Sequence, residues 1–74
     1  MKVLEFFRRQ RGLSQTGLGD ITRIHQNWIS ALERGAALPQ GDQAARLARA
    51  LGAPEHQLLD EIADPIAAVQ AGVR

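Results

Sequence analysis

Polar side chains that suit the recognition of nucleic acid gather in residues 14–35. Gln26 and Asn27 are adjacent, and an amide side chain can form two hydrogen bonds at once with the edge of adenine in the major groove. Trp28 adds an indole N–H that can donate to a phosphate while its ring packs, and Ala31 can touch a thymine methyl group. Each has a plainer alternative: helix capping or solvation for the amides, core packing for Trp28 and simple helix formation for Ala31.

The sequence carries little material for catalysis. Ser14, Ser30, His25 and His56 are its only Ser and His residues, and Cys is absent. No Gly-rich phosphate loop and no HExxH spacing occurs. We therefore expect no enzymatic activity, no metal and no cofactor.

The length of the chain, its lack of Cys and its apolar runs limit the possible classes of protein. Seventy-four residues allow one domain with one small core. The lack of Cys suits a reducing cytoplasm, and we find neither an apolar run of membrane length nor a secretory leader. The sequence therefore predicts a cytoplasmic protein that neither spans a membrane nor is secreted.

Charge is distributed unevenly along the chain. Residues 1–37 hold six basic and three acidic residues, whereas residues 38–74 hold three basic and five acidic residues. The basic half contains the amide-rich stretch, which favours a polyanion as the partner. Scattered surface charge is the alternative interpretation.

Apolar residues recur with a helical period, and no segment alternates as a strand would. Capping residues and glycines then divide the chain. The prediction is an all-α protein with helices over residues 2–11, 15–22, 26–34, 42–51 and 54–62, and a further short helix over 66–71. We expect one domain over residues 1–63, followed by a short tail over 64–74.

The order of motifs resembles the Cro/C1-type (XRE) helix-turn-helix family. The resemblance rests on RRQRGLSQ at residues 8–15, LERG at 32–35 and LARALGAPEHQLL at 47–59, and it covers residues 2 to about 62. It implies a compact five-helix, lambda-repressor-like domain whose third helix, about Gln26–Arg34, lies in the DNA major groove.

The resemblance also implies roles for particular residues. The position of Gln26 matches a base reader in the family, and Asn27 and Ala31 are further base-reading candidates from the chemistry of their side chains. Arg8 and Glu33 match a buried ion pair that joins the first and third helices, and Gln15 matches a residue that contacts the DNA backbone and braces the base-reading amide. The expected phosphate contacts are Gln15, Trp28, Ser30, Arg34, Arg11 and Arg23.

Three residues depart from the family pattern. The family usually has Glu, Ala and Gly where this chain has Gly17, Gly19 and Arg23. Two glycines weaken a helix by roughly 0.5–1 kcal/mol each relative to Ala, although Gly19 suits a close approach between helices. Arg23 replaces a residue that usually adopts positive φ, which predicts a strained or differently shaped turn.

The sequence thus predicts a repressor-like transcription regulator that binds double-stranded DNA. One small domain reads few base pairs, so a homodimer on palindromic DNA is expected. Leu59, Ile62, Ile66 and Val69 are the candidate dimer interface. The alternative function is an antitoxin that binds a toxin protein as well as its own promoter.

Overall fold

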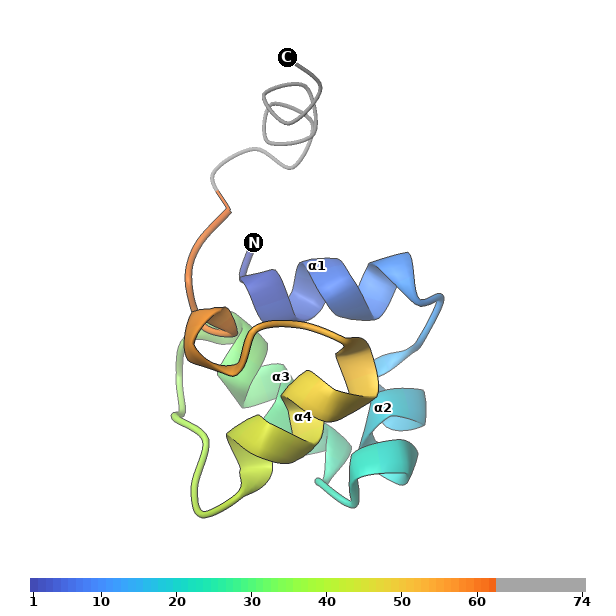
Figure 1. Ribbon diagram of the computed structural model, residues 1–74. Coiled ribbons are helices and arrows are strands. Elements are labelled where there is room, and N and C mark those ends of the chain that lie inside the picture. The colour runs from blue at the N-terminus through green and yellow to red at the C-terminus, as the bar shows by residue number, and fades with distance from the viewer. Residues whose placement is uncertain (63–74) are drawn as a thin grey trace.

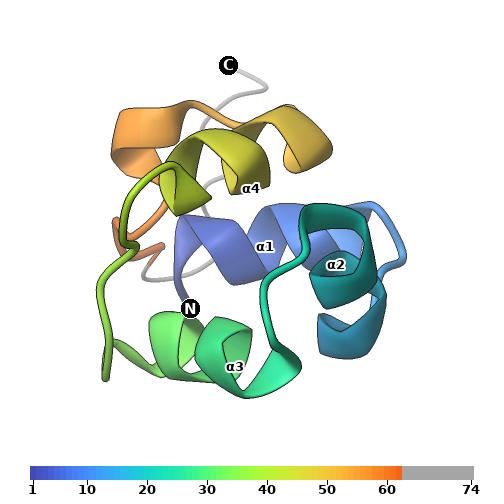
Figure 2. The ribbon, with the colours of Figure 1, turned by 90° about the horizontal axis from the view of Figure 1, so that it is seen from below.

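The computed structural model describes residues 1–62 of the chain. This part contains four α-helices and one short 3-10 turn, and it contains no strand. The elements are α1 (Val3–Gln10), α2 (Gln15–Thr22), α3 (Gln26–Arg34), α4 (Gln43–Leu51) and η1 (Glu55–Gln57). Seen from below, α3 and α4 lie on opposite sides of α1, with α2 beside one end of α1 (Figures 1 and 2).

A single apolar core holds the helices together. Each of the four α-helices and the segment after η1 contributes at least one fully buried branched side chain, and these are Leu4, Leu18, Ile29, Leu32, Leu47, Leu51 and Leu58. Full burial of such a side chain stabilises the fold by roughly 1.5–3 kcal/mol. The all-α prediction is confirmed for the described residues.

The second helix begins and ends at residues with special backbone geometry. Ser14 is the N-cap, and its hydroxyl oxygen accepts a hydrogen bond from the Gly17 N–H at 2.9 Å. The helix ends at Arg23, which has φ 59° and ψ 36° and is the only non-glycine with positive φ in residues 1–62. The turn therefore keeps the left-handed geometry that usually favours glycine, and Arg23 bears the strain.

Gly19 allows the chain to turn closely after α2. A Cβ at this position would lie 2.6 Å from the carbonyl oxygen of Ile24 and 3.6 Å from Ile29 Cδ1. The backbone of the turn therefore occupies the space that a side chain would need. This approach brings the start of α3 against α2.

The prediction of a fifth helix over residues 54–62 is wrong. Only Glu55–Gln57 forms a 3-10 turn, and the chain then runs beside the N-terminus, where Lys2 and Glu61 form an antiparallel bridge. The N–H groups of Val3 and Leu4 donate to the carbonyl oxygens of Asp60 and Leu58, at 2.9 and 2.8 Å. The first turn of α1 needs such acceptors, and the carbonyls of Leu58 and Asp60 supply them.

The bounds of α2 and α3 match the prediction, and those of α1 and α4 differ from it by one residue. The first helix spans Val3–Gln10 instead of residues 2–11, and α4 begins at Gln43 because Asp42 is its N-cap residue. The helix expected over residues 66–71 and the tail over 64–74 lie outside the described residues.

Candidate nucleic-acid interface

A continuous series of hydrogen bonds joins α1, α2 and the start of α3. Arg8 Nε and Nη2 donate to the two carboxylate oxygens of Glu33 at 2.7 and 3.1 Å. Gln15 Nε2 donates to Glu33 Oε1 at 3.0 Å, and Gln15 Oε1 accepts from Gln26 Nε2 at 3.1 Å. The amide of Gln26 is therefore positioned by a network that reaches back to the first helix.

The ion pair at the base of this network is buried. Arg8 is 8% exposed and Glu33 is 9% exposed, and Arg8 Nη1 also donates to the Leu13 carbonyl at 2.8 Å. The hydrogen bond from Arg8 to Glu33 raises the pKa of the Arg8 guanidinium above its ordinary value. The pair is fully hydrogen-bonded, which is the condition under which buried charges are tolerated.

The start of α3 is capped by a histidine. Nδ1 of His25 accepts a hydrogen bond from the Asn27 N–H at 3.0 Å. This contact gives His25 a structural role at the N-cap, where a side chain must satisfy a free backbone N–H. It also leaves Asn27 exposed at the first turn of the helix.

One face of α3 points away from the core. Its members recur at steps of three and four residues, and they are Asn27, Ser30, Ala31 and Arg34. Asn27 and Arg34 are exposed, whereas Ser30 and Ala31 are partly buried. Arg34 Nη1 donates to Ser30 Oγ at 2.6 Å. Together with Gln26, these residues form a polar surface of amide, hydroxyl and guanidinium groups, which we call the α3 surface.

Trp28 contacts the first residue of α4. Its indole N–H donates to Gln43 Oε1 at 2.9 Å, and the same oxygen accepts from the Gln40 N–H at 2.9 Å. The ring is partly buried and packs against the core. The structure thus gives the indole N–H a partner within the protein, and sequence reasoning missed Gln43 because nothing in its local pattern indicates this contact.

A comparison of sequences identifies the family of this domain. A family model described as a helix-turn-helix domain matches residues 3–61. The chain belongs to this helix-turn-helix domain family. No curated protein and no solved structure matches the chain.

Membership of the helix-turn-helix family supports DNA as the partner of this domain. The second helix of such a motif enters the DNA groove. Among residues 1–62, no helix is long and apolar enough to cross a membrane. The same residues contain no group of three or more His, Asp or Glu side chains that could hold a metal ion.

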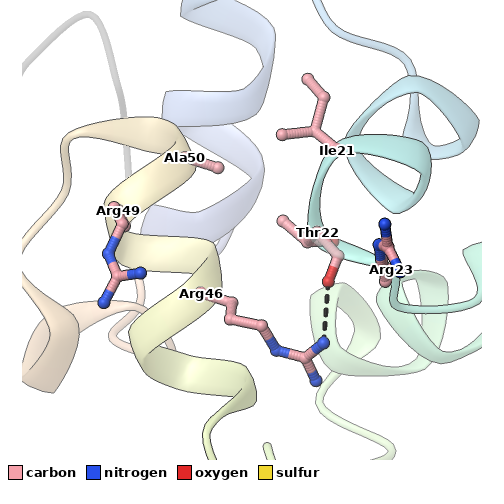
Figure 3. A pocket seen from close by; sticks show the side chains of 6 residues that line it. All are labelled: Ile21, Thr22, Arg23, Arg46, Arg49 and Ala50. Carbon is pink, nitrogen blue, oxygen red and sulfur yellow. Dashed lines mark hydrogen bonds between the residues drawn. The ribbon is translucent and has the colours of Figure 1, made fainter.

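Arg23 lies at the edge of the α3 surface of this helix-turn-helix domain, whereas Arg11 lies near the C-terminus of α4. Arg23 lines an open pocket of about 320 Å³ between α2 and α4, together with Ile21, Arg46 and Arg49 (Figure 3). It also borders a second hollow beside Gln26. The Arg11 guanidinium lies against Gly52 at the C-terminus of α4, because a Cβ on Gly52 would be 2.6 Å from Arg11 Nη2.

The pocket between α2 and α4 contains a contact that satisfies the end of α2. Arg46 Nη1 donates to the Thr22 carbonyl at 3.0 Å (Figure 3), and Arg46 Nε lies 3.3 Å from Asp42 Oδ1 without a hydrogen bond. Carbonyls at a helix C-terminus need such donors, and a cation is favourable there. Arg46 therefore fixes α4 against the turn that presents α3.

The predicted dimer residues fall into two groups. Leu59 is partly buried and packs against the core, and the N–H of Ile62 donates to the Met1 carbonyl at 2.7 Å. Ile66 and Val69 lie outside the described residues. Leu59 thus contributes in part to the core of its own domain, whereas the contact given for Ile62 is made by its backbone.

Proposed function

We propose that this domain is a transcription regulator that binds specific sequences in double-stranded DNA, with α3 in the major groove. The observation that carries the proposal is the position of Gln26, partly buried at the start of α3 and held by Gln15. An amide held at the N-terminus of a recognition helix can contact a base edge with little further loss of side-chain freedom.

Residues around Gln26 supply the remaining contacts that we propose. Asn27 and Ala31 lie on the same exposed face as candidate base contacts. Arg34 and Ser30, already hydrogen-bonded to each other at 2.6 Å, would bind phosphate oxygens, as would Gln15 at the N-terminus of α2. Arg23, beside Gln26, would add positive charge at the edge of the site.

Trp28 and Arg11 fit a phosphate role less well. The indole N–H of Trp28 is bonded to Gln43, so it would have to exchange this partner for a phosphate. Arg11 reaches the C-terminal end of α4. We therefore assign Trp28 to the support of α3 and Arg11 to the general positive charge of the first half of the chain.

A repressor-like role follows from the proposed site. A domain that occupies the major groove of a promoter excludes other proteins from the same sequence. Because one small domain reads only a few base pairs, we propose that two copies bind a palindrome.

The substitution Gln26→Ala tests the proposal. We expect it to weaken binding to the preferred duplex by roughly 1–3 kcal/mol, with little change on a duplex of unrelated sequence. Preferred sequences are first selected from random duplexes, and affinities are then compared by fluorescence anisotropy at one fixed salt concentration. Equal losses on both duplexes would show that Gln26 does not read a base.

A further inference from the structure

We propose that Glu33, although buried and unable to reach DNA from its place in the core, determines which base Gln26 selects. The inference rests on the proposed function and adds a residue that sets the specificity of the same site. The carboxylate of Glu33 fixes the direction of the hydrogen bonds that run through Gln15 to Gln26.

The first step concerns the orientation of the Gln15 amide. A carboxylate paired with a guanidinium can only accept hydrogen bonds, whereas an amide has a donating nitrogen and an accepting oxygen. Gln15 must therefore turn its nitrogen toward Glu33, as its Nε2 does at 3.0 Å from Glu33 Oε1. Its oxygen is then directed toward Gln26 at the start of α3.

The second step transfers this direction to Gln26. The oxygen of Gln15 can only accept, so Gln26 must turn its nitrogen toward it, and the distance is 3.1 Å. One N–H of Gln26 is used in this bond. Its second N–H and its Oε1, which has no hydrogen bond among residues 1–62, remain for a ligand.

The third step relates this orientation to the bases. The adenine edge offers one acceptor and one donor in the major groove, whereas the guanine edge offers two acceptors. An amide that presents one N–H and one oxygen matches adenine. The reversed amide, with its oxygen toward Gln15, would present only donors and would match guanine. Glu33 thus favours adenine over guanine at the position that Gln26 reads.

Burial makes Glu33 an effective determinant of this direction. Glu33 is 9% exposed, and Arg8 holds both of its oxygens, so water cannot readily replace either contact. Gln15 and Gln26 are themselves partly buried. A hydrogen-bonded series of this kind is stronger in a region of low dielectric constant than in water.

The test begins with the free protein, so that it does not depend on DNA binding. Side-chain amide signals of Gln15 and Gln26 are recorded by ¹⁵N NMR in the wild type, in Glu33→Gln and in Glu5→Gln. Glu5→Gln is the matched control, because Glu5 pairs with Arg9 at the surface at 2.7 Å. We expect Glu33→Gln to shift both amide signals and to speed their hydrogen exchange, and Glu5→Gln to change neither.

The second part measures base choice on two duplexes that differ only by adenine or guanine at the position read by Gln26. We expect the wild type and Glu5→Gln to favour adenine by about tenfold or more, and Glu33→Gln to lose most of that ratio. Because Glu33→Gln weakens the pair with Arg8, Gln15→Met serves as a second variant that leaves the Arg8–Glu33 pair in place. It should lose the ratio as well.

The outcomes separate the inference from the proposed function. An unchanged adenine preference in a folded Glu33→Gln or Gln15→Met protein overturns the inference and leaves DNA binding intact. Amide signals of Gln15 and Gln26 that do not respond to Glu33→Gln overturn it as well, whatever the binding data show. If the amide signals of Gln15 and Gln26 respond to Glu33→Gln but the wild type shows no sequence preference, the proposed function is overturned. The link from Glu33 to base choice is then overturned as well.

Discussion

Glu33 and Arg34 are adjacent in the sequence, but their side chains point about 100° apart around α3. Glu33 is buried and bonded to Arg8 and Gln15, whereas Arg34 is exposed and bonded only to Ser30 among the described residues. Two charged neighbours therefore act in different ways: Glu33 supports the fold and the orientation of an amide, and Arg34 supplies charge to the α3 surface.

Substitution of each by alanine should separate these roles. Glu33→Ala leaves the Arg8 guanidinium buried without its partner, which costs about 3–5 kcal/mol, a large part of the stability of a domain of this size. Arg34→Ala should leave the melting temperature nearly unchanged and should weaken binding to all duplexes alike. Thermal melting followed by circular dichroism, together with binding assays, measures both. A Glu33→Ala protein that melts normally but binds poorly would reverse the assignment.

At the residue level, the sequence allowed part of the site to be predicted. The resemblance to a known family indicated the positions of Arg8, Glu33, Gln15 and Gln26, and the structure brings all four together. The bond from Trp28 to Gln43 could not be predicted. It depends on how the loop before α4 folds back on α3, and such tertiary contacts leave no local pattern.

Among the elements, α2 has the least intrinsic helix stability. It contains Gly17 and Gly19 and has no acidic residue in its first turn and no basic residue in its last turn. Its position depends instead on the Ser14 cap, on burial of Leu18 and on the contact of Arg46 with the Thr22 carbonyl. Packing therefore determines how α2 presents α3.

The two glycines of α2 should respond in opposite ways to alanine. Gly17→Ala should stabilise the domain by up to about 1 kcal/mol, because alanine favours a helix over glycine. The atoms nearest a new Cβ belong to side chains: the capping Ser14 Oγ, at 3.2 Å, has to shift by a few tenths of an ångström, and Leu13 Cδ2 lies at 3.7 Å. Gly19→Ala should destabilise it, because the new Cβ would lie 2.6 Å from the backbone oxygen of Ile24. Chemical denaturation of both variants measures the difference. A stabilising Gly19→Ala would show that the turn can move aside.

The end of the domain shows where helix prediction fails. Residues 54–62 carry the apolar spacing of a helix, but the carbonyls of Leu58 and Asp60 bond the first turn of α1. The period of apolar residues gives no information on backbone groups that a distant segment needs. The bounds of the four α-helices that form the core were predicted to within one residue, because their apolar faces and capping residues are visible in the local sequence.

In the described part of the molecule, residues 1–4 bond to residues 58–62 and so join the two ends of the domain. Lys2 Nζ lies 2.9 Å from Glu61 Oε1, and the Met1 amino group lies 3.1 Å from Glu61 Oε2. The hydrogen bond from Lys2, and after it that from the Met1 amino group, lowers the pKa of the Glu61 carboxyl below its ordinary value of 4.5. The pair lies at the surface, so salt should weaken it.

This lowered pKa predicts a dependence of stability on pH. A carboxyl whose pKa is lowered in the folded state stabilises the fold above its ordinary pKa, and the contribution disappears as the pH falls through the lowered pKa. The wild type should therefore melt above Glu61→Gln at neutral pH, and the gap should close as the pH falls below about 4.5. Glu55→Gln is the control, since Glu55 is exposed and forms no ion pair among residues 1–62. A gap that is constant from acid to neutral pH would contradict the prediction.

Two copies of the domain are expected to pair on palindromic DNA, which requires a surface for their contact. Among the predicted interface residues, Leu59 packs into its own core and the backbone of Ile62 bonds Met1. Ile66 and Val69 lie outside the described residues. The exposed large apolar residues Ile21 and Leu38, at 59% and 71% exposure, are the competing surfaces within the described part of the domain.

A truncated chain that ends at Asp64 tests which surface is used. We expect the full chain to form a weak two-fold dimer on a palindromic duplex, and the truncated chain to bind each half-site as well as the full chain but without pairing. Sedimentation velocity of both proteins, alone and with one or two half-sites, measures the assembly. The variant Leu38→Ser in the full chain is the control, and it should pair normally. If the truncated chain pairs as tightly as the full chain while Leu38→Ser does not, the interface lies on the α3–α4 loop and the residues beyond Asp64 are not needed.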